Sequence, residues 1–433
     1  MNIDYKIYKK LTFIQKLGND SVHTGNAIPA ADVLFSLKAL FEFIQWIDYC
    51  YGGDSYEQRQ VDEKQIPAEK VVLAMQKIKE QKSLLDEKNA EIEALRKQIE
   101  TLSAIYTAQK AQNQQEESRI FEAEDISEFE TRKRFIDLDL RLMGWKLEGA
   151  DADVDVWQEY KVEDMAGVAG QSGYVDYVLL GRDKLPLAVV EAKRTSKDPK
   201  KGERQAELYA EALANKFGRM PMIFTTNGFE TYFWDLEAGI PRRVSSVFSK
   251  GDLQRLMNRR TEKKDLYAVE IDDKITDRYY QKEAIRAVCD HILEGHRKNL
   301  LVMATGTGKT RTASSLVDVL SRGGYVTNIL FLADRTALVK QAKDDFKKYL
   351  PDLSLCNLCS NKDDRSARIV FSTYPTMLNA IDSAKTKDGQ PIFTPAHFDL
   401  IIIDESHRSI FKKYRVIFEY FDAMLLGLTA TPK

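Results

Sequence analysis

Residues 299–310 read NLLVMATGTGKT and set the fold of the C-terminal part of the chain. An apolar run leads into a Gly/Thr-rich turn, and the helix-forming stretch RTASSLVDVL follows it. Glycines in such a turn let backbone N–H groups point inward around phosphate oxygens, while the Lys reaches the β- and γ-phosphates and the final Thr holds Mg²⁺. Met303 stands where the general pattern has Gly, but the strand–loop–helix context is right. We predict a nucleotide-binding loop formed by Thr305, Gly306, Thr307, Gly308, Lys309 and Thr310.

Further apolar runs of strand length accompany this loop. Besides residues 299–304 they occupy 328–333, 368–373, 400–404 and 425–429. Continuous apolar strands that alternate with helical stretches are typical of a parallel sheet covered by helices on both faces. The sequence therefore predicts an α/β domain with a doubly wound parallel sheet over residues 265–433.

An acidic pair, Asp404 and Glu405, ends the apolar run LIII. The carboxyl edge of a parallel sheet is where a nucleotide-bound Mg²⁺ and the attacking water are handled. We expect Asp404 to bind Mg²⁺ through its hydration shell and Glu405 to polarise the water.

These motifs, in this order, resemble those of superfamily 2 helicases and translocases. MATGTGKT, DESH and LTATP look like motifs I, II and III, and the resemblance covers residues 270–433. It implies a RecA-like domain that binds ATP, in which Gln281 of RYYQ reads adenine and Arg335 of ADR touches the nucleic-acid backbone. Such motors hold the nucleotide between two RecA-like domains. Because the sequence stops at Lys433, just after motif III, we expect a fragment that lacks the second domain, binds ATP and hydrolyses it poorly.

A second constellation lies in GYVDYVLL (173–180) and LAVVEAK (187–193). Glu191 and Lys193 are two residues apart and so share one face of a strand. Together with Asp176 they can bring two carboxylates to one divalent metal, beside an ammonium that positions a water and offsets phosphate charge. The alternative interpretation is a solvent-facing sheet edge that carries an ordinary ion pair.

This pattern resembles the PD-(D/E)xK nuclease fold, in the variant found near the N-terminus of type I restriction subunits. The resemblance implies an α/β nuclease domain over residues 119–264, with Asp176, Glu191 and Lys193 as the catalytic acid, acid and lysine and with Mg²⁺ as the metal. Residues 193–204 hold six basic and two acidic residues, and next to a nuclease centre we expect them to contact phosphates. The supporting residues are Glu128, Glu130, Gln205 and Tyr209, and the expected DNA contacts in this loop are Arg194, Lys197, Lys200 and Lys201.

The N-terminal region is predicted to be helical over residues 1–66, followed by a long helical arm over 67–118. Within 31–51, helical spacing gives one broad apolar face formed by Leu34, Leu37, Leu40, Phe41, Ile44 and Ile47. In the arm, apolar residues recur every seven positions from Val71 to Ile99, which is typical of a long helix or coiled coil. We favour packing of this arm within the chain or on a partner over homodimerisation.

Composition excludes several classes of protein. The 433 residues carry a formal net charge of −2, so the chain is not a globally basic nucleic-acid coat. No apolar run approaches the roughly 20 residues of a membrane span, and four cysteines are too few for a disulfide scaffold. We expect a soluble cytoplasmic protein without membrane contact.

We interpret Cys356 and Cys359 as ordinary thiols, and we expect no constellation among His291, His296 and His397.

The combined order of helical region, arm, nuclease and motor resembles the restriction (R) subunit of a type I restriction-modification enzyme. The resemblance implies ATP-driven DNA translocation and Mg²⁺-dependent cleavage of double-stranded DNA, in complex with modification (methyltransferase) and specificity subunits. Two alternatives remain open at this point. One is a stand-alone superfamily 2 helicase–nuclease in repair or phage defence, and the other is a catalytically silent DNA-binding or assembly module.

Overall fold

The computed structural model describes residues 3–24, 28–51, 59–61, 127–148, 154–163, 172–194, 198–360, 366–386, 389–404 and 414–430. The chain forms two compact units, Met1–Glu124 and Asp125–Lys433. The arm predicted over 67–118 lies outside the described residues.

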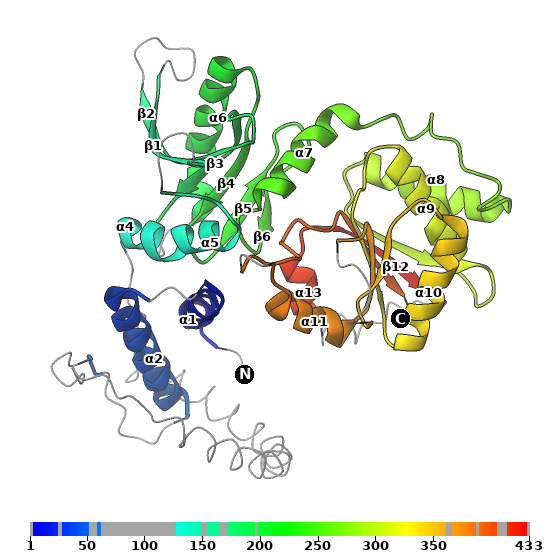
Figure 1. Ribbon diagram of the computed structural model, residues 1–433. Helices are drawn as coiled ribbons and strands as arrows, with labels where there is room; N and C mark the ends of the chain where they lie inside the picture. Colours follow the sequence, from blue (N-terminus) through cyan, green and yellow to red (C-terminus); the bar gives the residue numbers. More distant parts are fainter. Residues whose placement is uncertain are drawn as a thin grey trace. The chain divides into compact units, whose positions relative to one another are not determined.

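The first unit contains a pair of helices, α1 (Tyr5–Thr24) and α2 (Ala30–Tyr51) (Figure 1). Their shared core includes Ile7 from α1 and Trp46 and Cys50 from α2. The helix predicted over 31–51 is confirmed. Of its apolar face, Leu34, Phe41 and Ile47 are half-buried. Leu37, Leu40 and Ile44 are 40%, 41% and 62% exposed, because α2 packs on α1 through the side that carries Trp46 and Cys50.

The second unit begins with a six-stranded sheet in the order β1-β2-β3-β4-β5-β6. Neighbouring strands are antiparallel apart from β3 and β4, which run parallel. A parallel pair needs a crossover connection, and α6 (Glu203–Phe217) supplies it. The strands are β1 (Val156–Val162), β2 (Gly173–Leu180), β3 (Pro186–Ala192), β4 (Met222–Thr226), β5 (Thr231–Trp234) and β6 (Arg242–Val244).

Helices cover both faces of this sheet (Figure 1). On one face α6 packs against apolar residues of β2 and β3, among them Val178 and Val189. On the other face α5 and α7 pack against residues such as Leu179 and Val190. The double cover explains why β3 is buried along its whole length. The remaining elements of this part are α4 (Glu128–Thr131), η2 (Arg132–Ile136), α5 (Asp137–Leu142), η4 (Pro199–Gly202) and α7 (Lys250–Glu262).

The C-terminal part is a second six-stranded sheet, ordered β7-β12-β11-β8-β10-β9, in which every pair is parallel. The predicted parallel sheet is thus confirmed, and the sequence pattern missed only the short β9. The strands are β7 (Lys298–Val302), β8 (Ile329–Ala333), β9 (Leu355–Asn357), β10 (Ile369–Thr373), β11 (Leu400–Asp404) and β12 (Met424–Thr429).

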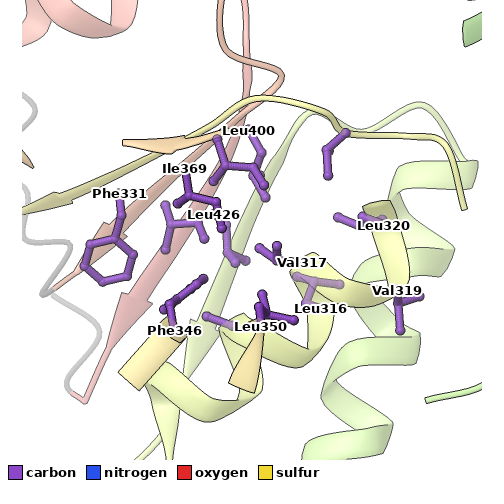
Figure 2. Packing of buried hydrophobic residues seen from close by; sticks show 14 of the residues in the cluster. Leu316, Val317, Val319, Leu320, Phe331, Phe346, Leu350, Ile369, Leu400 and Leu426 are labelled. Carbon is purple, nitrogen blue, oxygen red and sulfur yellow. The ribbon is translucent and has the colours of Figure 1, made fainter. Parts of the chain in front are cut away.

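Two helical layers enclose this sheet. Figure 2 shows the core on one side, where Leu316 and Leu320 of α9 and Phe346 of α10 meet strand residues such as Phe331 and Leu426. α11 and α13 cover the opposite face. No described helix is both long and apolar enough to cross a membrane. The helices are α8 (Tyr279–Leu293), α9 (Lys309–Arg322), α10 (Thr336–Tyr349), α11 (Tyr374–Ser383) and α13 (Arg415–Tyr420).

Candidate functional site

Asp176, Glu191 and Lys193 lie together on the face of the first sheet that α6 covers. The antiparallel register pairs Tyr177 of β2 with Val190 of β3, and one step further along it brings Asp176 beside Glu191. Glu191 is 3% exposed, and its Oε1 is 2.6 Å from Lys193 Nζ. The backbone N–H of Ala192 donates to Asp176 Oδ2 at 2.8 Å. Two carboxylates and an ammonium therefore share one patch next to the start of a helix.

The N-terminal turn of α6 closes over this patch. A Cβ at Gly202, the residue before α6, would lie 3.1 Å from Glu191 Cγ and 3.2 Å from Lys193 Cε. Such contacts are tighter than ordinary van der Waals packing, so a side chain at position 202 would push on both groups. Glycine at position 202 therefore lets α6 begin directly beside Glu191 and Lys193.

Gln205 and Tyr209 extend the patch along α6. Gln205 Oε1 is 3.4 Å from Lys193 Nζ, and Gln205 Nε2 donates to Tyr209 Oη at 2.7 Å. Burial raises the pKa of Tyr209; the bond from Gln205 opposes the rise, and the charges of Glu191 and Asp176 add to it. The phenol therefore stays protonated at neutral pH and can donate a hydrogen bond. Gln205 and Tyr209 thus extend a series of hydrogen bonds from Lys193 along α6.

Arg132 is a member of the patch that the sequence interpretation missed. Its Nη1 donates to Asp176 Oδ1 at 2.7 Å and its Nη2 donates to Glu159 Oε1 at 2.9 Å. The predicted Glu130 is 3.6 Å from Arg134 instead, with half of its side chain exposed. The Glu128 side chain lies outside the described part. In this stretch the sequence predicts the acids Glu128 and Glu130 as supporting residues, whereas Arg132 makes the contact with Asp176.

The donor set of the patch fits a divalent cation. Asp176 and Glu191 offer the oxygen ligands that Mg²⁺ prefers. Thr225, which pairs with Glu191 across β3 and β4, is buried on the same face. Among the described residues, its Oγ1 has no hydrogen-bond partner. A buried hydroxyl without a partner beside two carboxylates is a suitable neighbour for a bound ion or its water.

The basic loop is only partly described. Arg194 and Lys200 are exposed, and Lys200 Nζ lies 5.1 Å from the centre of the Tyr232 ring. Lys197 and the Lys201 side chain lie outside the described residues. Two of the four residues predicted to contact phosphates therefore lie on the surface near the N-terminus of α6.

The loop predicted to bind a nucleotide joins β7 to α9. Gly306 and Gly308 have φ angles of 82° and 92°, in the left-handed region that glycine adopts without strain. Thr307 Oγ1 donates to the Ala304 carbonyl at 2.7 Å and braces the turn. Thr305 is exposed, and Lys309 and Thr310 lie in the first turn of α9 with half-buried side chains.

Gln281 lies beneath this loop. It is fully buried; its Nε2 donates to the Thr307 carbonyl at 2.8 Å, and its Oε1 accepts from Thr276 Oγ1. A Cβ at Gly308 would come within 2.6 Å of Gln281 Nε2. Gln281 thus holds the shape of the loop, in addition to the adenine contact expected from the sequence.

Asp404 ends β11, two strands away from β7 in the sheet. Tyr374, at the start of α11, is fully buried nearby, and burial, then Asp404 and Asp334, raise the pKa of its phenol. Arg335 is exposed at the N-cap of α10. Glu405 lies outside the described residues. The loop and Asp404 therefore occupy the carboxyl edge of the parallel sheet, where a nucleotide is expected.

Two protein-family profiles match the chain. Residues 38–242 match the type I restriction enzyme R protein N terminus, and residues 274–433 match the res subunit of type III restriction enzymes. The first match covers the Asp176 patch and the second covers the nucleotide-binding loop.

Two curated relatives agree with these matches. The EcoAI endonuclease subunit of a type I restriction enzyme from Escherichia coli is 33% identical over 277 residues, covering 60% of this chain and 33% of the relative. The EcoKI endonuclease subunit from Escherichia coli (strain K12) is 26% identical over 395 residues, covering 71% and 33%. A solved fragment assigned as an HsdR subunit of a type I restriction enzyme from Vibrio vulnificus YJ016 is 26% identical, covering 72% and 56%, with a TM-score of 0.28. The chain spans about a third of the length of the two curated relatives.

Proposed function

Because the chain is an HsdR-like protein, related to the endonuclease subunits of type I restriction enzymes, we propose that it supplies the DNA-cleaving and ATP-binding parts of such a subunit. Residues 119–264 would cleave double-stranded DNA with Mg²⁺, and residues 265–433 would bind ATP for translocation along that DNA. The partners would be modification and specificity subunits, since base recognition belongs to a separate subunit in the family it resembles.

The observation that carries the cleavage proposal is the meeting of two carboxylates and a lysine on one sheet face. Asp176 and Glu191 would hold the cation, which when bound would activate a water and offset charge on the scissile phosphate. Lys193, whose Nζ is 2.6 Å from Glu191 Oε1, would orient that water and face the phosphate. Gln205 and the protonated Tyr209 would keep the Lys193 ammonium in position. Arg194 and Lys200 are exposed beside the patch and would contact the DNA backbone.

The second activity rests on the loop between β7 and α9. The backbone N–H groups of residues 305–310 would surround the phosphates at the positive end of α9, and Lys309 would neutralise their charge. Thr310 and Asp404 would hold the nucleotide's Mg²⁺ between them, and Glu405 would orient the attacking water.

The test of the cleavage proposal is a DNA-cleavage assay on the complete protein assembled with its partner subunits, in the presence of ATP and Mg²⁺. Asp176→Asn or Lys193→Ala should reduce cleavage at least about 100-fold, the scale on which loss of one electrostatic catalytic group reduces rates. Lys161→Ala is the matched control, because Lys161 is also two residues from its partner, Glu163, on a strand but is half exposed. Cleavage that survives both site variants would overturn the nuclease assignment.

A nucleotide-binding measurement separates the two activities. Lys309→Ala should abolish binding of a fluorescent ATP analogue, while Asp176→Asn should leave that binding unchanged. If Lys309→Ala binds the analogue as the parent does, the loop is not the nucleotide site. Absence of co-purifying modification and specificity subunits would instead favour a stand-alone helicase–nuclease.

A further inference from the structure

The C-terminal end of α8 reverses sharply and brings two histidines together. α8 ends at Leu293, Glu294 is its C-cap, and Gly295 has a φ of 89°. The backbone N–H of His296 then donates to the His291 carbonyl at 2.9 Å. This turn folds the His296 ring back over the last turn of the helix, where its centre lies 4.2 Å from that of His291.

Glu294 joins the two imidazoles. One ligand atom from each of His291, Glu294 and His296 lies within 4.8 Å of the other two. Glu294 Oε2 is 3.6 Å from His296 Nε2. The expectation that these histidines form no constellation is therefore wrong. A five-residue separation does not align two side chains on a continuous helix, and only the left-handed Gly295 brings them together.

A neighbouring strand fixes the tautomer of His291. Its Nδ1 lies 3.2 Å from Asn299 Oδ1 on β7, and an amide oxygen can only accept, so Nδ1 carries the proton. The lone pair of His291 is therefore on Nε2, the ring nitrogen that points away from the amide. Ligating histidines in metal sites are commonly held in this way by a hydrogen bond at their other nitrogen. The negative end of the α8 dipole also favours a cation here.

We propose that His291, Glu294 and His296 form a surface site for a late first-row divalent transition metal, with Zn²⁺ as the best fit. Two imidazoles and one carboxylate are a nitrogen-rich donor set that suits Zn²⁺ and Ni²⁺ and does not suit Mg²⁺. The three residues are exposed, so a water can complete a tetrahedral shell. The site is separate from the Asp176 patch and from the nucleotide-binding loop, and it needs neither for its chemistry.

The bound ion would tie the end of α8 to the edge of the parallel sheet. His291 is on α8 and is bonded to Asn299 on β7, so a metal on His291 stiffens the contact between helix and strand. The other end of α8 carries Gln281, which supports the nucleotide-binding loop. Zn²⁺ should therefore raise the thermal stability of the chain without taking part in ATP or DNA chemistry.

The test is calorimetric titration of the reduced chain with Zn²⁺. We expect a site that is present in the parent and lost in the His291→Ala/His296→Ala double variant. Glu283→Ala is the matched control, since it removes an exposed carboxylate from the same helix outside the cluster. Asn299→Ala keeps every ligand and should weaken binding by about 10–100-fold, as loss of a supporting hydrogen bond does.

Co²⁺ spectra and ATP binding complete the test. Co²⁺ in the parent should give a spectrum of nitrogen and oxygen ligation, without the thiolate charge-transfer band that cysteine ligands would add. Unchanged ATP binding shows that the double variant is folded. Equal Zn²⁺ binding by parent and double variant, or a thiolate band that accounts for all binding, would overturn the proposal and leave the nuclease assignment untouched.

Discussion

Arg132 and a metal ion would compete for the same oxygen of Asp176. Both carboxylate oxygens are engaged, Oδ1 by Arg132 and Oδ2 by the backbone N–H of Ala192. A cation that binds through Oδ1 would share this oxygen with the guanidinium, whose positive charge opposes a second cation there; Glu159 is a second partner for Arg132. In the proposed metal site Arg132 would therefore compete with the cation for the charge of Asp176.

Arg132→Ala should therefore raise the affinity of the patch for Mn²⁺, because Asp176 Oδ1 is freed. Calorimetric titration should show a several-fold gain in Mn²⁺ affinity. Arg132→Lys should give a smaller gain, because an ammonium makes a weaker and single contact. Arg134→Ala, two residues along on the same helix, should leave Mn²⁺ affinity unchanged. A loss of Mn²⁺ binding in Arg132→Ala, comparable to that of Asp176→Asn, would show that Arg132 supports the site and does not compete.

The two glycines of the loop predicted to bind a nucleotide differ in their surroundings. Gly306 and Gly308 have similar left-handed φ angles, but their surroundings differ. A Cβ at Gly306 would meet no atom within 4 Å, whereas a Cβ at Gly308 would collide with Gln281 Nε2. The two positions share the same backbone strain and differ in packing.

Gly308→Ala should consequently reduce ATP affinity more than Gly306→Ala. The left-handed conformation costs roughly 1–2 kcal/mol for either alanine, and only the variant at 308 must also displace Gln281. Titration with a fluorescent ATP analogue measures the difference. Equal losses of affinity in Gly306→Ala and Gly308→Ala would mean that backbone strain alone sets the effect.

The sequence predicts elements best where the apolar pattern is unbroken. The runs that became β7, β8, β10, β11 and β12 are continuous, and the strand–loop–helix motif correctly placed residues 305–310 after β7, reaching into the first turn of α9. β9 has three residues and no pattern long enough to detect. On α2, Leu37, Leu40 and Ile44 of the apolar face are exposed, because helical spacing cannot tell which side meets α1.

In the candidate sites, too, some residues follow from the sequence pattern and others depend on contacts that the pattern does not encode. Glu191 and Lys193 share a face by strand alternation, and Asp176 meets them through the register that pairs β2 with β3. Arg132 could not be found this way, because its contact with Asp176 spans 44 residues of sequence. The His291 cluster depends on the conformation of one glycine, which no periodicity encodes.

At the scale of the second unit, ion pairs join the two sheets. Asp422, just before β12, accepts two hydrogen bonds from Arg242 of β6, at 2.8 and 2.6 Å, and a third from Arg297 at 2.8 Å. The Asp422 side chain is only 10% exposed. Burial alone would raise the pKa of this carboxyl, but Arg297 and Arg242 outweigh it and hold the pKa below 3.8.

Asp422→Asn should destabilise the second unit by about 3–5 kcal/mol, because breaking a buried ion pair leaves uncompensated charge. Urea unfolding monitored by circular dichroism measures the loss. Glu419→Gln is the control: its pair with Arg415 is largely exposed, so the change should stay within about 1 kcal/mol. Similar unfolding midpoints for the two variants would contradict a structural role for Asp422.

Stability should also depend on pH through His397, which lies at the same junction. Burial lowers its pKa below 6.5; Asp252 and Asp399 oppose the shift, and Arg255 adds to it. The unfolded chain then binds a proton more readily than the folded one, so the contribution is complete above pH 6.5 and is lost as the pH falls below that value. The urea midpoint should be lower at pH 5.5 than at pH 7.5, and His397→Asn should diminish the difference. A variant with the parent's full pH dependence would exclude His397 as its source.

Helix α7 is fastened on both sides. Leu253 of α7 is buried in the core beneath β3, the strand that carries Glu191. Arg259 of α7 lies 2.7 Å from Asp399, the residue before β11, and β11 ends at Asp404. Arg255 adds a second contact to Asp399 at 3.6 Å. A displacement of β11 would therefore be passed to β3 through paired charges and a packed side chain, so the two sheets of the second unit should move together.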